Sequence, residues 1–187
     1  MNEERIEAYL SLIQELLECP SGEENEVLNR HLELVDEGFV QMCDRVAQQL
    51  QEEGEENLAG FLQNLAQQVG AFLGRRRSAA QLADCAETGT LHINPIIYAE
   101  VSIGFKEVTE VESVLSSSVF QRDGLPYEAA FLAGQAFLQY RRRGGVRRSP
   151  LPDFYIGAHG LVCRYSLLTR DATRYQTYFP ELILISP

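Results

Sequence analysis

The sequence predicts an α/β domain over residues 75–187, preceded by a small helical bundle over residues 1–74. In the first part, apolar residues recur at the three- and four-residue spacing of amphipathic helices. In the second part, short apolar segments alternate with helical patterns, which is typical of a mainly parallel sheet. The charge changes at the same place, because residues 1–74 hold 3 Lys or Arg against 16 Asp or Glu, whereas residues 75–187 hold 13 against 11. This asymmetry indicates two units with different partners.

Four short amphipathic helices are predicted in the first unit. The first contains RIEAYLSLIQELLEC and ends at the proline and glycine of CPSGEEN. Apolar positions at helical spacing predict three more, over residues 27–35, 39–50 and 58–72. Brief connections favour a small bundle. Because its carboxylates are dispersed over solvated faces, we interpret this unit as an interaction module.

The boundary between the units is expected at GRRRSAAQLADCAETG, which starts at Gly74. Three consecutive arginines interrupt the apolar pattern there, and the apolar residues of a new helix follow them. Charge runs are rarely buried. We therefore expect an exposed hinge between two separate helices.

Strands and helices alternate in the second unit. LHI is a short apolar strand, and Asn94 followed by Pro95 is the signal of a helix start. Further helices are predicted in KEVTEVESVL, in LPYEAAFLAGQAFLQYRRR and in the segment that begins at Pro152. SLLT and LILIS are the remaining strand candidates.

Three carboxylates stand in or beside these apolar segments: Glu100 within IIYAEVSIGF, Asp153 directly after Pro152, and Asp171 directly after SLLT and Arg170. One interpretation is that they are unrelated helix caps and salt-bridge partners, since a helix N-terminus favours negative charge. The other is that they converge near the carboxyl ends of the strands, where ligands gather in such sheets. Their mutual repulsion would then be relieved by Mg²⁺ or Mn²⁺, which prefer oxygen ligands. We favour the metal site.

The second unit resembles bacterial PIN-domain proteins, in particular the VapC-type toxins of type II toxin–antitoxin pairs. The segments that carry the resemblance are INPIIYAEVSIGF, LPYEAAFLAGQAFLQYRRRGGVRRSPLPDFYIGAHG, LLTRDATRYQTYFP and LILIS, and it covers residues 78–187 almost continuously. The resemblance implies a PIN-like three-layer α/β sandwich with a mainly parallel sheet. It also implies that Glu100, Asp153 and Asp171 are catalytic and belong to the acidic tetrad that holds Mg²⁺ or Mn²⁺. The implied activity is endoribonuclease cleavage of RNA, often a structured RNA such as tRNA, with a cognate antitoxin and a second copy of the chain as protein partners.

The sequence departs from that family at its first strand. The family opens with a hydrophobic strand that ends in an aspartate, within a VDTN-like stretch, whereas the match here begins only at SAAQLA. VGAFLG is the nearby apolar candidate, and no acid follows it. Asp84 lies within a helix that the family also has, so it does not replace the missing acid. A weak or inactive nuclease is therefore expected from this chain alone, and the rival interpretation is a non-catalytic PIN remnant that serves as an interaction or assembly module.

Basic residues surround the proposed site. We expect Arg143, Arg147, Arg148 and Arg170 to contact RNA phosphates. For Arg143 and the two arginines before it, a solvated helix C-terminus that prefers cations explains the cluster equally well.

The acidic N-terminus argues against a targeting peptide, and no apolar run approaches the length of a membrane span. We expect a cytoplasmic protein that does not contact membranes.

Overall fold

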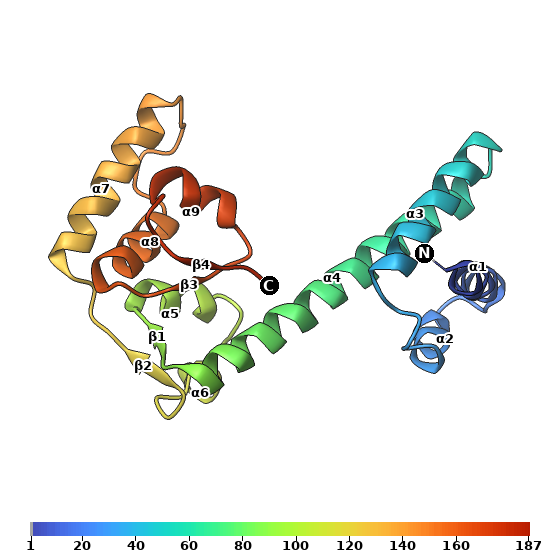
Figure 1. The fold of residues 1–187 in the computed structure, drawn as a ribbon, viewed down its shortest axis with the longest axis horizontal. Helices are drawn as coiled ribbons and strands as arrows, with labels where there is room; N and C mark the ends of the chain where they lie inside the picture. The colour runs from blue at the N-terminus through green and yellow to red at the C-terminus, as the bar shows by residue number, and fades with distance from the viewer. Residues whose placement is uncertain (1) are drawn as a thin grey trace. The chain divides into compact units, whose positions relative to one another are not determined.

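The structure is a computed structural model that describes residues 2–187, which form nine helices and four short strands (Figure 1). The chain divides into two compact units, Met1–Arg77 and Ser78–Pro187. The structure is mostly helical with a few short parallel strands, which is compatible with the predicted α/β class. Within residues 2–187, no helix combines the length and the apolar character that a membrane span requires.

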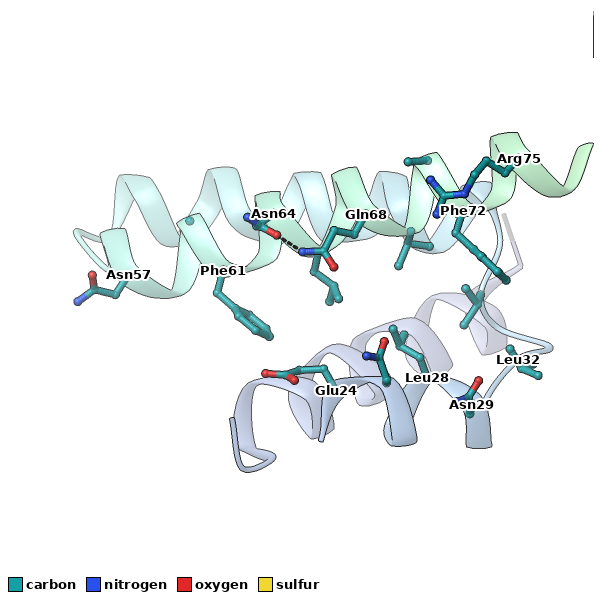
Figure 2. Close-up of a pocket in the computed structure, with 16 residues that line it drawn as sticks. Glu24, Leu28, Asn29, Leu32, Asn57, Phe61, Asn64, Gln68, Phe72 and Arg75 are labelled. Atoms are coloured by element: carbon teal, nitrogen blue, oxygen red, sulfur yellow. Dashed lines mark hydrogen bonds between the residues drawn. The ribbon is translucent and has the colours of Figure 1, made fainter. Parts of the chain in front are cut away.

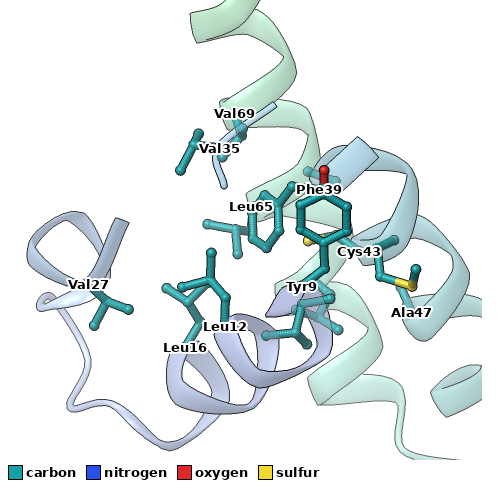
Figure 3. Close-up of a cluster of buried hydrophobic side chains, with 14 residues drawn as sticks. Tyr9, Leu12, Leu16, Val27, Val35, Phe39, Cys43, Ala47, Leu65 and Val69 are labelled. Carbon is teal, nitrogen blue, oxygen red and sulfur yellow. The ribbon is translucent and has the colours of Figure 1, made fainter. Parts of the chain in front are cut away.

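The first unit is helical throughout, as the sequence predicts. It contains α1 (Glu3–Glu18), α2 (Glu24–Arg30), α3 (Glu37–Glu52) and the first part of α4 (Glu56–Thr88). Its core gathers apolar side chains from all four helices, among them Tyr9, Leu16, Phe39 and Leu65 (Figure 3).

Asp36 ties α3 to α1. As the N-cap of α3 it accepts a hydrogen bond from the Phe39 N–H at 3.0 Å. The hydroxyl of Tyr9 donates to the same carboxylate at 2.7 Å, and the guanidinium of Arg5 pairs with it at 2.5 Å. Partial burial would raise the pKa of Asp36, but these hydrogen bonds outweigh it and hold the pKa below its usual value.

The expected break between two separate helices at the arginines is wrong. Helix α4 runs from Glu56 to Thr88 without a break, through Arg75, Arg76 and Arg77. Arginine and alanine are good helix formers, and an isolated glycine such as Gly74 costs only about 1 kcal/mol in a helix interior. The change in the apolar pattern therefore marks where the helix leaves one unit and enters the other, not where it ends.

The second unit begins within α4 and contains the strands. After β1 (Leu91–Ile93) come α5 (Pro95–Ser102), α6 (Val108–Val114), β2 (Phe120–Arg122) and α7 (Tyr127–Arg142). Helix α8 (Pro152–Cys163), β3 (Leu167–Leu168), α9 (Ala172–Tyr178) and β4 (Leu184–Ile185) complete it. Strand β2 and helix α9 are the elements that the sequence reading omits.

The strands pair in parallel, as expected, but in the described chain they form two separate sheets rather than one. Strand β1 pairs with β2, with Leu91 opposite Phe120, and β3 pairs with β4, with Leu167 opposite Leu184. Helix α8 packs against α7, α5 and α9. Its Phe154 and Ile156 lie in the main core of this unit, together with Ala133 and Phe179.

Candidate functional site

Asp153 lies in the first turn of α8, where Pro152 occupies the first helical position as the sequence predicts. The N-cap of this helix is Leu151, so Asp153 does not cap it. Its carboxylate instead contacts α9, where Arg174 pairs with it and the hydroxyl of Tyr175 donates to it at 3.3 Å. The location of Asp153 is thus fixed by contacts made across the unit and not only by the helix dipole.

Asp171 is the N-cap of α9. Its side chain accepts the Arg174 N–H at 3.3 Å, and the Arg174 Nε lies 3.3 Å from its second carboxylate oxygen. The guanidinium of Arg174 therefore joins two of the predicted site residues, Asp153 and Asp171. Asp171 thus has the contacts of a helix cap and a salt-bridge partner, because one carboxylate oxygen caps α9 while the other faces Arg174.

Glu100 approaches the same place from α5. Although the residue is exposed, partial burial of its carboxyl and the nearby charge of Asp153 raise the pKa of Glu100 above its usual value. Burial and the same aspartate also raise the pKa of Tyr175. Asp153 and Asp171 both pair with Arg174, and the charge of Asp153 acts on Glu100. We call these three residues, Glu100, Asp153 and Asp171, the acidic cluster.

The arrangement is incomplete as a metal site. Among residues 2–187, no group of three or more His, Cys, Asp or Glu side chains is placed to hold a metal ion. The donor chemistry suits Mg²⁺ or Mn²⁺, because all three residues offer carboxylate oxygens. The guanidinium of Arg174, however, supplies the positive charge between Asp153 and Asp171 that a cation would otherwise supply. The residues therefore fit the cation by chemistry, and a bound cation would compete with Arg174.

Replacing Arg174 by glutamine is expected to tighten Mn²⁺ binding about tenfold, since it leaves Asp153 and Asp171 without their cationic partner. Arg170→Gln, which removes the same charge from an exposed position beside Asp171, should change the affinity little. Asp153→Asn and Asp171→Asn should weaken it. Calorimetric titration of the full chain measures all four, with binding to the acidic first unit as a background common to them. Equal affinity in all the variants would rule out the acidic cluster as a cation site.

The four predicted RNA-binding arginines do not lie in one environment. Arg143 is the C-cap of α7, with its guanidinium 5.5 Å from the centre of the Tyr178 ring. Arg147 and Arg148 are exposed in the loop before α8, and the Arg147 carbonyl accepts a hydrogen bond from the Arg141 side chain at 2.7 Å. Arg170 is exposed just before Asp171. The loop arginines are thus available to a polyanion, whereas Arg143 already has an aromatic partner.

A second polar group lies between β1 and α8, which the sequence reading does not predict. Asp123, just after β2, accepts a hydrogen bond from the Tyr165 hydroxyl at 3.0 Å and lies 2.7 Å from the Nδ1 atom of His92. The rings of His92 and Tyr165 stack, with their centroids 4.3 Å apart. Burial would raise the pKa of Asp123, but these hydrogen bonds outweigh it and lower the pKa, so the ionised carboxylate accepts the proton of His92 Nδ1. No spacing in the sequence joins these residues, because the partners are up to 42 positions apart.

Asn94 has two functions at the start of α5. Its Oδ1 atom accepts hydrogen bonds from the N–H groups of Ile96 and Ile97, both at 3.0 Å, which confirms the predicted N-cap. Its Nδ2 atom lies 2.9 Å from Nδ1 of His159, which is 4% exposed. The two capping hydrogen bonds identify which atom of the Asn94 amide is the oxygen, so the Nδ2 atom is the donor to His159 and the Nδ1 atom of His159 is the acceptor. The proton of the neutral imidazole therefore resides on Nε2.

A cavity also lies in the first unit, between α2 and α4, with a volume of about 800 Å³ (Figure 2). Apolar side chains such as Leu28, Phe61 and Phe72 alternate along it with amides such as Asn64 and Gln68, which hydrogen-bond to each other. The lining of this cavity therefore combines apolar surface with amide groups.

No protein-family model and no curated protein sequence matches the chain. Among solved structures, it is similar to a chain in the crystal structure of VapBC2 from Rickettsia felis bound to a DNA fragment from their promoter. The identity is 21% and the TM-score 0.45, over 58% of this chain and 83% of that chain.

Proposed function

We propose that the second unit is a metal-dependent endoribonuclease of the VapC type, the toxin of a toxin–antitoxin pair that hydrolyses RNA phosphodiesters. The observation that carries this proposal is the electrostatic conflict at the acidic cluster. Partial burial and the charge of Asp153 raise the pKa of Glu100, while Asp153 and Asp171 share one cation, which in this structure is the guanidinium of Arg174. A site with this charge pattern favours Mg²⁺ or Mn²⁺ once Arg174 moves aside. The sequence resemblance supports the same assignment.

In this proposal each residue of the chain has a defined task. Glu100, Asp153 and Asp171 hold the cation, which when bound activates water and stabilises charge on the attacked phosphate. Arg174, released from Asp153, can pair with a phosphate oxygen of the substrate. Arg147 and Arg148, exposed in the loop that leads to Asp153, guide the RNA backbone, as does Arg170. A cognate antitoxin silences the enzyme, a homodimer is its proposed assembly, and the helical first unit is its interaction module.

The second candidate function is a non-catalytic PIN remnant that acts as an interaction or assembly module. Two observations favour it: no three acidic side chains are gathered as metal ligands among residues 2–187, and the two-stranded sheets do not join. Under this alternative, Arg174 is a permanent structural partner of Asp153 and Asp171 and is not displaced.

RNA cleavage by the full chain decides between the two. We expect slow cleavage of a structured RNA in Mn²⁺, slower cleavage in Mg²⁺, and none in EDTA, because Mn²⁺ tolerates an imperfect ligand set better. Asp153→Asn should abolish the activity, and Asp84→Asn, an exposed acid on α4, should leave it unchanged. Metal-independent cleavage, or cleavage that survives Asp153→Asn, would reject the nuclease. Complete absence of cleavage in both metals would favour the remnant.

A further inference from the structure

Two strands of the second unit have an unpaired edge that faces the same cavity. Strands β1 and β3 both line a pocket of about 720 Å³, here called the β1–β3 pocket. Strand β2 covers one edge of β1, and β4 covers one edge of β3. The two sheets are not joined across the pocket.

The hydrogen-bond pattern shows which main-chain groups face the free edges. The Asp123 N–H donates to the Ile93 carbonyl, and the Leu167 N–H donates to the Ile183 carbonyl. In a parallel ladder, alternate residues point their N–H and C=O toward the same neighbour. The main-chain groups of His92 and Leu168 therefore point away from β2 and β4, toward the pocket side. A peptide strand is the ligand whose own main chain complements such edges.

One residue that lines the pocket also carries a buried, unpaired hydrogen-bond donor. His159 lines the pocket from α8, and its Nε2 is the buried side-chain atom without a hydrogen-bond partner among residues 2–187. Because its Nδ1 accepts from Asn94, the unpaired Nε2 carries the proton and requires an acceptor. An unpaired buried donor costs about 1–3 kcal/mol.

Apolar side chains form a large part of the remaining lining, which also includes Thr90, Arg164 and Ser166. The apolar residues include Leu91, Ile97, Ile156 and Leu167, from both sheets and from the helices that flank them. Alternate apolar side chains of an extended strand would bury this surface, while the main chain bonds to the strand edges. The described chain has no spare strand of its own, because β1 to β4 are already paired and all other regular elements of residues 2–187 are helices.

We infer that the β1–β3 pocket binds an extended, apolar strand of a partner protein, which joins the two sheets. The strand is short, since β1 has three residues and β3 has two. Binding in this mode does not depend on the proposed nuclease activity, and it is measured without RNA.

A synthetic peptide tests the inference. The probe alternates valine with threonine, ends this run in aspartate, and has lysines at both ends for solubility. A matched peptide with proline in the centre of the run cannot donate to a strand edge. We expect the first peptide to bind the full chain and to protect the amides of His92 and Leu168 from hydrogen exchange, with a shift of the His159 Nε2 resonance. The proline peptide should do neither.

Two variants of the protein locate the binding edge. Leu168→Pro removes an N–H that faces the pocket and leaves the pairing of β3 with β4 intact, so peptide affinity should fall about tenfold or more. Leu184→Pro removes an N–H on β4 that faces away from β3 and should change the affinity less than threefold.

Three outcomes would overturn the inference. They are absence of binding by the first peptide, equal affinity in the two proline variants, and protection of His92 and Leu168 by self-association of the chain at high concentration. The last would mean that a second copy, not a partner strand, fills the pocket.

Discussion

The strand peptide whose valine–threonine run ends in aspartate is expected to raise Mn²⁺-dependent RNA cleavage by this protein about a hundredfold. Asn94 follows β1 directly and Asp171 comes soon after β3, so a parallel strand between them would end beside both. The side-chain carboxylate of the aspartate would then join the acidic cluster as a fourth oxygen ligand. Misplacement of reacting groups by about 1 Å costs about a hundredfold in rate, which is the gain expected when a firmer ligand set is supplied.

The matched control is the same peptide with asparagine in place of aspartate. It should bind the β1–β3 pocket and leave the cleavage rate unchanged, because it adds the strand without the charge. Asp153→Asn protein should stay inactive with either peptide. Single-turnover cleavage of a labelled RNA, with peptide occupancy followed by hydrogen exchange, measures both events. Occupancy without a rate increase would contradict the added fourth ligand and leave the pocket inference standing, whereas absence of occupancy would contradict the pocket inference alone.

Local signals in the sequence are sufficient to predict several of the elements. Asn94 with Pro95, and Pro152 with Asp153, act through hydrogen bonds and dihedral angles within one helical turn, and both helices begin where these residues predict. Strand β2 is not predicted because Phe120–Arg122 is short and mostly exposed, without an apolar run. The continuity of α4 through Arg75–Arg77 depends on helix propensity, which the charge pattern conceals.

The candidate site is less accessible to sequence reasoning. Its acids stand out because they interrupt apolar segments, but nothing local pairs Asp153 with Arg174, which lies 21 positions away. That contact is created when α9 packs on α8. The unpaired Nε2 of His159 is likewise a result of tertiary structure, because it depends on Asn94 taking the other ring nitrogen and on burial of the ring.

The packing of α8 against α9 depends on a glycine, Gly157. Gly157 of α8 faces the ring of Phe179, and a Cβ added at this position would lie 2.6 Å from Cδ2 and Cε2 of that ring and 3.0 Å from Cδ1 of Tyr175. Both aromatic residues are at most 5% exposed, so neither can turn into solvent. The space between the helices therefore requires glycine, although glycine disfavours helix by about 1 kcal/mol relative to alanine.

Gly157→Ala is accordingly expected to destabilise the second unit by about 1–3 kcal/mol, because the overpacking exceeds the gain in helix propensity. Gly134→Ala is the matched control: in α7 of the same unit, no atom lies within 4 Å of the added Cβ, so the unit should gain about 0.5–1 kcal/mol. Hydrogen exchange of the full chain, read over α8 and α9, measures both changes within one unit. Since Tyr175 adjoins Arg174, Gly157→Ala should also loosen the ion pairs of Arg174 with Asp153 and Asp171. Equal protection in the two alanine variants would show that α9 can shift without cost, and that the acidic cluster is not held by this packing.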